Sequence, residues 1–279
     1  MTLLAEGQIR DQFDKQGFVV LRDYIDQQLI TEMQDELEHI VDEEADKLLA
    51  AGKIKSRFEN EPFETRMFKL YESDVKSAPT RFRENLHRPA FYKLFFHPDL
   101  LDTVELLLGP EIRVYPNYTV RPKFPDWAGH QVLWHQDGGY TGTQGAVSEL
   151  RMVNVWTPLV PVNPENGCMQ FIPGTHKLGI LPHDSKEYYL QLHDEHLKPR
   201  LHQAIDLAIN PGDVIFFHNL LFHQGLPNRT KKIRWSVDWR YQDATQDTQR
   251  AKSGHLARSQ MHPEDVVRDA EHWSKLSYT

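Results

Sequence analysis

The stretch VLWHQDGGY, residues 132–140, places an imidazole and a carboxylate two positions apart at the end of an apolar run. Side chains at positions i and i+2 of a β-strand point to the same face, so His135 and Asp137 can converge on one point. Both are ligands that first-row transition metals accept. The pair alone is equally typical of a strand end at which a histidine and an aspartate satisfy each other. A metal site therefore requires a third ligand from a distant strand.

Two histidines compete for that position in the segment PGDVIFFHNLLFHQGLPNRTKKIRWSVDWRY, namely His218 and His223. The spacing favours His223, because it lies where an apolar strand gives way to the turn-forming residues QGLPN. His218 is more typical of a residue that packs or hydrogen-bonds inside a barrel.

Arg234 follows in the same segment, between Ile233 and Trp235 in an otherwise apolar strand. A buried arginine is costly unless it is paired with an anion. The planar guanidinium suits a carboxylate well. That carboxylate could belong to a ligand or to an Asp or Glu of the fold, and the residues alone leave both alternatives open.

The elements that must position these residues fall into three zones. Residues 5–50 read as helix, strand and helix, the first helix ending at Gly17, and residues 80–110 read as helical again. From about 112 to 242, short strand-like runs alternate with Gly/Pro turns, which favours a sandwich or barrel over a parallel α/β sheet. The polar last zone, 243–279, predicts a short helix in HPEDVVRDAEHW with Pro263 at its first position.

The composition limits the classes of partner. The net charge of −8 argues against nucleic acid or an anionic membrane, because both are bound through basic patches. The single cysteine, Cys168, excludes an internal disulfide and predicts a reducing, cytoplasmic location. The polar start and the lack of a long apolar run predict neither a signal peptide nor a membrane span. Without repeats or an evident linker, one domain is expected over residues 1–279: a helical part (1–110), a β core (about 112–242) and a tail (243–279).

The same residues resemble a known family. The set His135-x-Asp137, His223 and Arg234 is similar to the motif of the iron(II)- and 2-oxoglutarate-dependent dioxygenases of the phytanoyl-CoA dioxygenase type. The opening IRDQFDKQGFVVLRDYI, the stretch ENGCMQFIPGTHKLG and the whole segment that carries His223 also match the family's pattern. The resemblance implies a mainly β fold with flanking helices, a double-stranded β-helix or cupin-like jelly roll.

The resemblance also implies the reaction. Two imidazoles and one carboxylate, from His135, Asp137 and His223, would hold iron(II) and leave three positions open. 2-Oxoglutarate and dioxygen would be the co-substrates, and succinate and carbon dioxide would be released as an unactivated C–H bond is hydroxylated. Arg234 would bind the far carboxylate of 2-oxoglutarate. Further contacts to this co-substrate are expected from residues at positions that match the family, namely Gln136, Trp156, Asn117 and Lys69.

One position departs from the family's pattern. Relatives often carry Ser or Thr two residues after the second histidine, and this sequence has Gly225 there. One hydrogen bond to the co-substrate is thereby removed, but the anchoring arginine is kept.

The substrate is expected to be a small polar or anionic molecule, and no oligomeric state is predicted. Arg121 and Lys123, beside Trp127 and His130, are expected at the entrance of the site. A closable cover is expected from residues 240–259 or from the loop 124–130, because the oxidising centre must be shielded from water. The first stretch could equally be a tail on the barrel wall. The expected substrate contacts are Arg121, Lys123, Tyr140, Arg250 and Arg258.

Two other classes of function remain open. The three ligands could hold zinc and a water for hydrolysis, or they could stabilise a binding module without turnover. Arg234 counts against both, because neither needs a buried cation near the metal. Asp137 counts against halogenation, which requires a small residue in place of the metal carboxylate. The remaining candidates are expected to be structural: a turn residue, His176, a buried filler, Cys168, and loop residues of a polar insert, His183, His193, His196 and His202.

Overall fold

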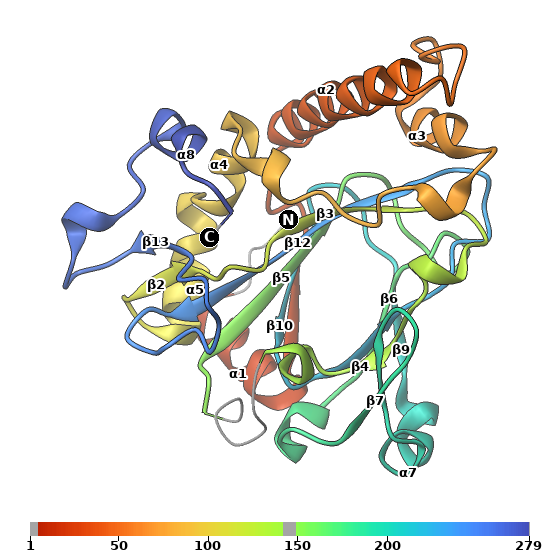
Figure 1. Cartoon of the computed structure of the whole chain (residues 1–279). Helices are drawn as coiled ribbons and strands as arrows, with labels where there is room; N and C mark the ends of the chain where they lie inside the picture. The colour runs from red at the N-terminus through yellow and green to blue at the C-terminus, as the bar shows by residue number, and fades with distance from the viewer. Residues whose placement is uncertain (1–4, 142–148, 279) are drawn as a thin grey trace.

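The structure is a computed structural model that describes residues 5–141 and 149–278. Two antiparallel sheets form its centre (Figure 1). In the larger sheet the strands follow the order β1 (Phe18–Leu21), β10 (Val214–His218), β5 (Met152–Pro158), β12 (Arg234–Asp243), β2 (Ile112–Val114) and β13 (His255–Arg258), with β3 (Thr119–Lys123) also paired to β12. The smaller sheet has the order β4 (Val132–His135), β11 (Phe222–Gly225), β6 (Met169–Ile172) and β9 (Ile205–Leu207). Together with the flanking helices they confirm the predicted double-stranded β-helix.

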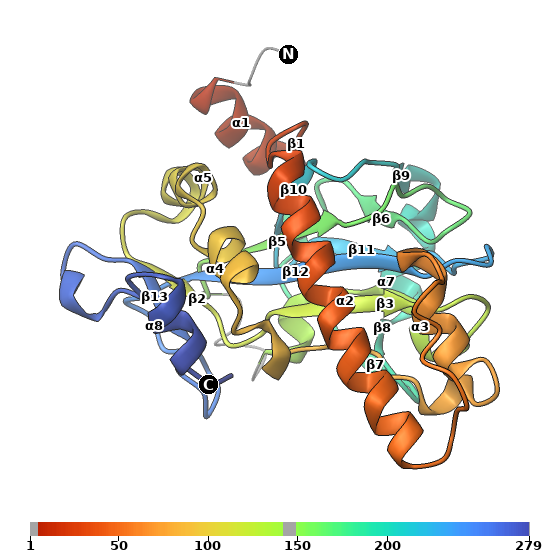
Figure 2. The ribbon, with the colours of Figure 1, turned by 90° about the horizontal axis from the view of Figure 1, so that it is seen from above.

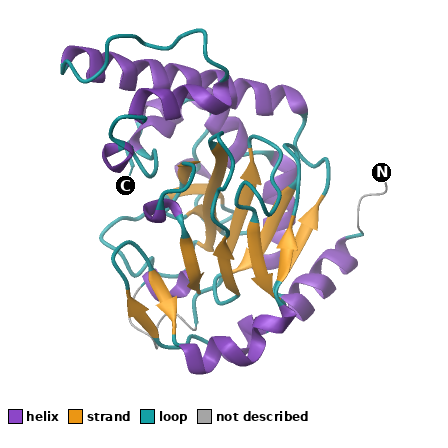
Figure 3. Cartoon of the chain, turned by 90° about the vertical axis from the view of Figure 1, so that its right-hand side faces the viewer, coloured by secondary structure: helices purple, strands orange, loops and turns teal. Residues whose placement is uncertain are grey.

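Helices cover the outer face of the larger sheet (Figure 2) and lie above and below the strands in Figure 3. They are α1 (Glu6–Gln16), α2 (Gln27–Ala50), α3 (Phe63–Tyr71), α4 (Pro89–Phe95), α5 (Pro98–Leu108) and α8 (Ala270–Lys275). The short α7 (Asp194–Leu197) packs instead against the smaller sheet through Leu197 (Figure 1). None of the helices in the described ranges combines the length and the apolar composition that a bilayer crossing requires.

Helix α2 shows how the sequence builds this layer. The carboxylate of its N-cap, Asp26, accepts a hydrogen bond from the backbone N–H of Leu29 at 2.8 Å. Apolar residues then recur at helical spacing, and Met33, Leu37 and Ile40 are completely buried. These side chains belong to one hydrophobic core with Trp235, Val237 and Trp239 of β12. The helix and the sheet are therefore joined by the apolar face of each.

Strand β12 separates this core from the interior of the barrel. Its odd-numbered residues, from Trp235 to Tyr241, are buried under the helices. Because side chains alternate along a strand, Arg234, Ser236, Asp238 and Arg240 point to the other side, between the two sheets. The interior of the barrel is thus polar along this strand.

The tail differs from the prediction. Residues 255–258 form β13 in the larger sheet, and the backbone N–H of Val267 donates to Leu256 O at 3.0 Å. This bond keeps the chain extended, so only a 3-10 turn forms at Pro263–Asp265. Helix α8 begins later, after Asp269, whose carboxylate accepts from the N–H of His272 at 2.7 Å. The prediction of one helix from Pro263 was therefore correct only in part: a 3-10 turn starts at Pro263, and the α-helix covers only the last four residues of the predicted stretch.

Gly17 ends α1 in a left-handed conformation, with a φ of 84°, as the prediction of a helix stop there requires. A Cβ at this position would lie 2.4 Å from Nδ1 of His176. We expect Gly17→Ala to lower the free energy of unfolding through both backbone strain and this clash. Gly52→Ala is the matched control, because Gly52 has a φ of 67° with no atom within 4 Å of the added Cβ. Urea unfolding should show a loss at Gly17 larger by at least about 1 kcal/mol; equal losses would mean that His176 moves aside freely.

Candidate active site

Three side chains converge between the two sheets. Strands β4 and β11 are antiparallel neighbours with His135 opposite His223, and their imidazole centroids lie 4.1 Å apart. Asp137 follows β4 at the start of a 3-10 turn, with Oδ1 3.4 Å from Nε2 of His135 and Oδ2 3.9 Å from Nε2 of His223. One ligand atom of each residue lies within 4.8 Å of the others, and all three residues are buried. The convergence predicted from the sequence is confirmed.

Both imidazoles are oriented by backbone carbonyl groups. Nδ1 of His135 lies 2.7 Å from Leu133 O, and Nδ1 of His223 lies 2.9 Å from Leu221 O. Because a carbonyl oxygen can only accept, each Nδ1 carries the proton and each Nε2 presents its lone pair to the centre. Burial lowers the pKa of His223 to about 3, so this imidazole is neutral near pH 7. With both Nδ1 atoms engaged by carbonyl groups, the Nε2 atoms of His135 and His223 are the ones that can bind a metal.

Asp137 is held by two further side chains that the sequence analysis did not identify. Arg240 Nη2 lies 2.7 Å from Oδ1, and Asn154 Nδ2 donates to Oδ2 at 2.9 Å. Burial alone would raise the pKa of Asp137, but the Arg240 charge and the two histidines lower it well below its usual range. The carboxylate is therefore ionised. Two imidazoles and one carboxylate form the donor set that non-haem iron(II) oxygenases use, so these residues fit that ion.

A second cluster lies on the same face of β12, six residues before Arg240. Arg234 is paired across the sheet with Lys123 of β3, and both side chains are buried. The guanidinium lies over the indole of Trp156, 5.5 Å from the ring centroid, and donates to Ser236 Oγ. The ammonium of Lys123 donates to Gly225 O at 2.9 Å. Neither cation forms an ion pair with a carboxylate anywhere in residues 5–141 or 149–278.

The pKa values of Arg234 and Lys123 show that no acidic group balances these two side chains. Burial and, to a smaller extent, the Arg121 charge lower the pKa of Arg234 to about 10. Burial also lowers the pKa of Lys123 well below its usual range, with Arg234 and Arg121 contributing in the same direction. A Cβ at Gly225 would lie 3.1 Å from the Lys123 ammonium. The glycine that departs from the family's pattern therefore leaves the space that Lys123 fills.

A cavity of about 220 Å³ opens at the metal triad, lined by His135, Asp137 and several arginines. Among the predicted substrate contacts it includes Arg121, Tyr140 and Arg250. Arg121 is paired with Asp238 at 2.6 Å, and Arg250 donates to Tyr140 O at 3.0 Å. Three of the five residues expected to touch the substrate are thus at the mouth of the site.

The comparison with known proteins agrees with this geometry. The sequence profile of the family described as phytanoyl-CoA dioxygenase (PhyH) matches residues 13–236, which is most of the chain. The chain belongs to the phytanoyl-CoA dioxygenase family. With the buried triad, this membership makes it an iron- and 2-oxoglutarate-dependent oxygenase, as the resemblance implied.

Individual relatives are distant. A probable phytanoyl-CoA dioxygenase of Caenorhabditis elegans is 25% identical over 251 residues, covering 85% of this chain and 75% of the relative. A 1-deoxypentalenic acid 11-beta-hydroxylase of Streptomyces arenae is 28% identical over 258 residues, covering 87% and 83%. Among solved structures, EctD from S. alaskensis with bound Fe has a TM-score of 0.63 at 19% identity, covering 92% of this chain and 87% of that one. At that identity the structural likeness supports the fold alone.

Two residues expected to contact 2-oxoglutarate point elsewhere in this family member. Lys69 lies on α3 with 36% of its side chain exposed, paired with Glu72 at 3.0 Å. The amide of Gln136 is occupied by backbone groups, donating to Gly179 O and Leu220 O at 2.7 Å and accepting from Leu181 N at 2.8 Å. Because Gln136 alternates with His135 and Asp137, its side chain points to the opposite face. Both expectations were wrong.

The other two 2-oxoglutarate contacts are placed differently. Trp156 lies against Arg234, and its contact with 2-oxoglutarate stays a prediction. Asn117 lines the cavity at the triad, where its Oδ1 accepts from Arg83 Nη2 at 2.9 Å. Asn117 is therefore near His135 and Asp137, in a cavity that neither Arg234 nor Lys123 lines.

Two of the expected substrate contacts lie elsewhere, and most of one of the two expected covers, residues 240–259, is part of the barrel wall, whereas the loop 124–130 stays a predicted cover. Arg258, in β13, binds Asp102 and Glu105 of α5 at 2.8 and 2.6 Å, on the outside of the sheet. Lys123 is buried beside Arg234 instead of lining the entrance. Of the stretch 240–259, both ends are strands of the larger sheet, because β12 runs to Asp243 and β13 begins at His255. The stretch reaches the cavity at two points, Arg240 in β12 and Arg250 in the loop between the two strands.

The mouth of the site is bordered instead by a hairpin within the polar insert, β7 (His183–Ser185) and β8 (Leu190–Leu192). The hairpin tip contributes Tyr188 and Tyr189 to the cavity, and Tyr189 Oη donates to Gly129 O at 3.0 Å. Tyr140 Oη accepts from the N–H of Leu190 at 2.7 Å. His183, expected to be a loop residue, therefore lies in a strand of this hairpin.

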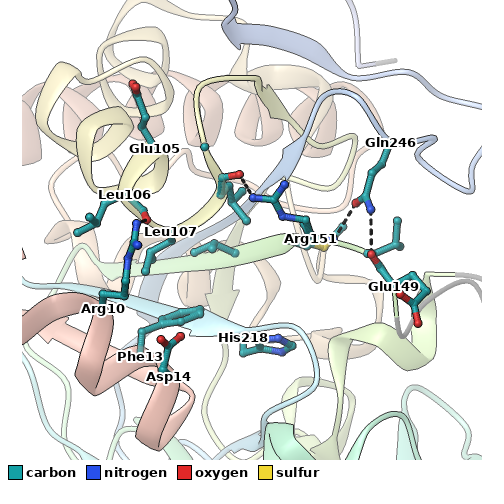
Figure 4. A pocket seen from close by; sticks show the side chains of 15 residues that line it. Arg10, Phe13, Asp14, Glu105, Leu106, Leu107, Glu149, Arg151, His218 and Gln246 are labelled. Atoms are coloured by element: carbon teal, nitrogen blue, oxygen red, sulfur yellow. Dashed lines mark hydrogen bonds between the residues drawn. The ribbon is translucent and has the colours of Figure 1, made fainter. Parts of the chain in front are cut away.

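A larger cavity, of about 810 Å³, lies away from the triad, between α1, α5 and the start of β5 (Figure 4). Its arginines are already engaged: Arg10 donates to Leu106 O, and Arg151 pairs with Asp243 at 2.7 Å. His218, the rejected metal ligand, lines this cavity, and burial lowers its pKa to about 4. Since no triad residue lines it, size does not identify the active site here.

His183 predicts a pH dependence. Its Nε2 accepts from the N–H of Gln136 at 3.0 Å, and burial lowers its pKa to about 4. An unfolded histidine has a pKa of about 6.5, so the unfolded chain binds more protons between these values. The contribution to stability is full above pH 6.5 and is lost as the pH falls toward 4, by up to about 1.4 kcal/mol per pH unit.

The measurement is urea unfolding of the metal-free protein between pH 7 and 5. We expect His183→Gln to flatten the decrease of the unfolding free energy relative to wild type. His262→Gln, a change of a histidine with an exposed side chain, is the control and should keep the wild-type slope. The same slope in all three proteins would contradict the role of His183.

Proposed function

We propose that this protein hydroxylates an unactivated C–H bond of a small anionic molecule, as one dioxygenase domain acting in the cytoplasm. One oxygen atom of dioxygen enters the product as a hydroxyl group, and 2-oxoglutarate takes the other as it is converted to succinate and carbon dioxide. The observation that carries the proposal is the buried pair of cations, Arg234 and Lys123, which has no carboxylate partner among the described residues and shares the barrel interior with the triad. The lone cysteine, buried and free, supports a reducing compartment.

In this proposal His135, Asp137 and His223 hold iron(II). When bound, the ion supplies the binding and activation of dioxygen. Arg240 and Asn154 fix the orientation of the Asp137 carboxylate, and the carbonyl groups of Leu133 and Leu221 fix the two imidazoles. The three side chains that hold the metal are thus positioned before the metal binds, so metal binding requires little reorganisation.

Arg234 and Lys123 bind the far carboxylate of 2-oxoglutarate. A carboxylate between them would neutralise two like charges that are otherwise buried together, which removes a large electrostatic cost. Trp156 supports the guanidinium from one side. Lys123 takes over the contact that Ser or Thr makes in relatives, because Gly225 leaves the space open for its ammonium. Asn117, at the metal side of the cavity, faces the substrate.

Side chains at the mouth exclude water from the reacting centre. The rings of Tyr188, Tyr189 and Tyr140 border the opening, and hydrogen bonds tie the β7–β8 hairpin to the loops around the triad. A hairpin held by a few such bonds can open for the substrate and close again.

The alternatives from other classes explain less. A zinc hydrolase or a metal-stabilised binding module has no use for two buried cations beside the metal. The Arg234 and Lys123 pair therefore favours an acid co-substrate over both.

Variants of the cation pair test this function. Arg234→Ala should weaken the binding of 2-oxoglutarate by about 10²-fold or more, because a charge-assisted pair is lost. Lys123→Met should weaken it at least about tenfold. Lys69→Ala is the matched control and should leave the affinity unchanged, because Lys69 lies on the surface of α3. Anaerobic calorimetry of the metal-loaded protein measures all three dissociation constants.

The outcomes separate the two assignments. Unchanged affinity in Arg234→Ala would contradict the proposed co-substrate site. A loss in Lys69→Ala with none in Lys123→Met would show that the surface lysine binds the acid after all. In wild type, succinate should form only when iron(II), 2-oxoglutarate and dioxygen are all present.

A further inference from the structure

The cavity at the triad holds more positive charge than its own acidic residues balance. Five arginines line it, and two of them are paired with carboxylates: Arg121 with Asp238 and Arg240 with Asp137. The other three, Arg81, Arg83 and Arg250, form no ion pair with any carboxylate in the described parts of the chain. A mouth with three such guanidinium groups attracts and holds an anion.

The segment Thr80-Arg81-Phe82-Arg83 shows that this arrangement is built into the fold. Phe82 pairs with Val120 of β3 through two backbone hydrogen bonds, of 2.9 and 3.0 Å, and its ring is stacked with Trp235 in the core. In an extended segment the flanking residues point to the opposite side. The anchoring of Phe82 in the core therefore directs both Arg81 and Arg83 to the cavity.

The three guanidinium groups have neutral hydrogen-bond partners, and that of Arg81 is Thr80 Oγ1 at 3.5 Å. Arg83 donates to Asn117 Oδ1 at 2.9 Å and lies over the ring of Tyr278, while its Nε has no partner. Arg250 donates to Tyr140 O and lies over the ring of Tyr115. Such contacts fix the direction of each group and leave its charge available. Burial lowers the pKa of Arg83, and the neighbouring Arg81 and Arg121 charges act in the same direction.

We propose that Arg81, Arg83 and Arg250 form a subsite for a compact, doubly charged oxyanion of the substrate, a phosphonate or phosphate-monoester group. This inference rests on the proposed function and names its substrate class. Three guanidinium groups that approach one small space match a tetrahedral group with three equivalent oxygens better than a planar carboxylate. The subsite holds the charged end of the substrate at the mouth, and the carbon to be oxidised then lies toward His135 and Asp137.

The size of the cavity limits the rest of the molecule. A volume of about 220 Å³ is below the range of roughly 300–1,000 Å³ that is usual for drug-sized ligands. Val132 and the tyrosines Tyr140, Tyr188 and Tyr189 supply the remaining lining. The substrate is therefore a short carbon skeleton with one charged end, and a long acyl chain does not fit inside this cavity.

The test uses the full-length protein loaded anaerobically with iron(II) and saturating 2-oxoglutarate, with methylphosphonate as the probe in calorimetry at pH 8. Wild type should bind methylphosphonate at least about tenfold more tightly than acetate. Arg83→Gln and Arg250→Gln should each weaken this binding at least about tenfold. Arg268→Gln, a change of an exposed arginine outside the cavity, is the matched control and should bind like wild type. If Arg83→Gln does not fold, Arg81→Gln carries the test, because Arg81 is exposed.

The outcomes are decisive in both directions. Coenzyme A serves as a second source of phosphate, and its binding without that of methylphosphonate would overturn the compact substrate. Equal binding of methylphosphonate by wild type and all arginine variants, or no binding by wild type, would also refute the subsite. The 2-oxoglutarate titration of the same wild-type sample separates this result from a failure of the proposed function. Bound 2-oxoglutarate without bound methylphosphonate refutes the subsite alone, whereas a protein that does not bind 2-oxoglutarate refutes the function.

Discussion

Strand β12 must place one face in a hydrophobic core and the other in a polar cavity, and the site depends on this constraint. The sequence RWSVDWRY satisfies it by strict alternation. Trp235 and Trp239 fix the strand against the helices, so that Arg234 and Arg240 cannot turn away from the barrel interior. A shift of the register by one residue would bury the charges in the core and expose the tryptophans to the cavity. The apolar face thereby sets the positions of the functional one.

The charges that face the interior of the barrel explain why an anion should bind there. Arg240 is balanced by Asp137, and Asp238 by Arg121 of the neighbouring strand. Arg234 and Lys123 are balanced by nothing within the described chain. Buried charges without partners are destabilising. An anion that binds between Arg234 and Lys123 removes this electrostatic cost, which makes its binding more favourable. Cation pairs of this kind are weak evidence for stability, and they are strong evidence for a binding site.

The sequence could predict the parts of the site that depend on local pattern. His135 and Asp137 share a strand face, His223 lies at a strand end beside a turn, and Arg234 is conspicuous among apolar neighbours. The same alternation that marks Arg234 also marks Arg240, and this signal was available in the sequence. The many short strands and their turns predicted a sandwich or barrel, and the resemblance to the family implied the double-stranded β-helix.

Other parts depend on contacts between distant segments and could not be read in this way. Lys69 was aligned with a co-substrate contact, yet helix α3 places it on the surface, while Lys123 reaches Arg234 only through the pairing of β3 with β12. Gln136 was predicted to contact 2-oxoglutarate from its position between His135 and Asp137. Its amide instead forms hydrogen bonds with backbone groups of two other loops. The β7–β8 hairpin reads as a polar insert, because Leu192 is the one residue of its two strands that is buried in an apolar cluster, and hydrogen bonds make its contacts near the triad.

The account's central claim is that one iron(II) and one 2-oxoglutarate complete this barrel together. Anaerobic titration of the protein with both, followed by visible absorption, tests it most directly. A weak charge-transfer band should appear only when both are present, saturate at one equivalent of each per chain, and be lost in Asp137→Ala, whose unfolding is monitored separately by circular dichroism. No band in the folded wild-type protein, or an equal band in folded Asp137→Ala, would contradict the assignment of the triad and of the reaction.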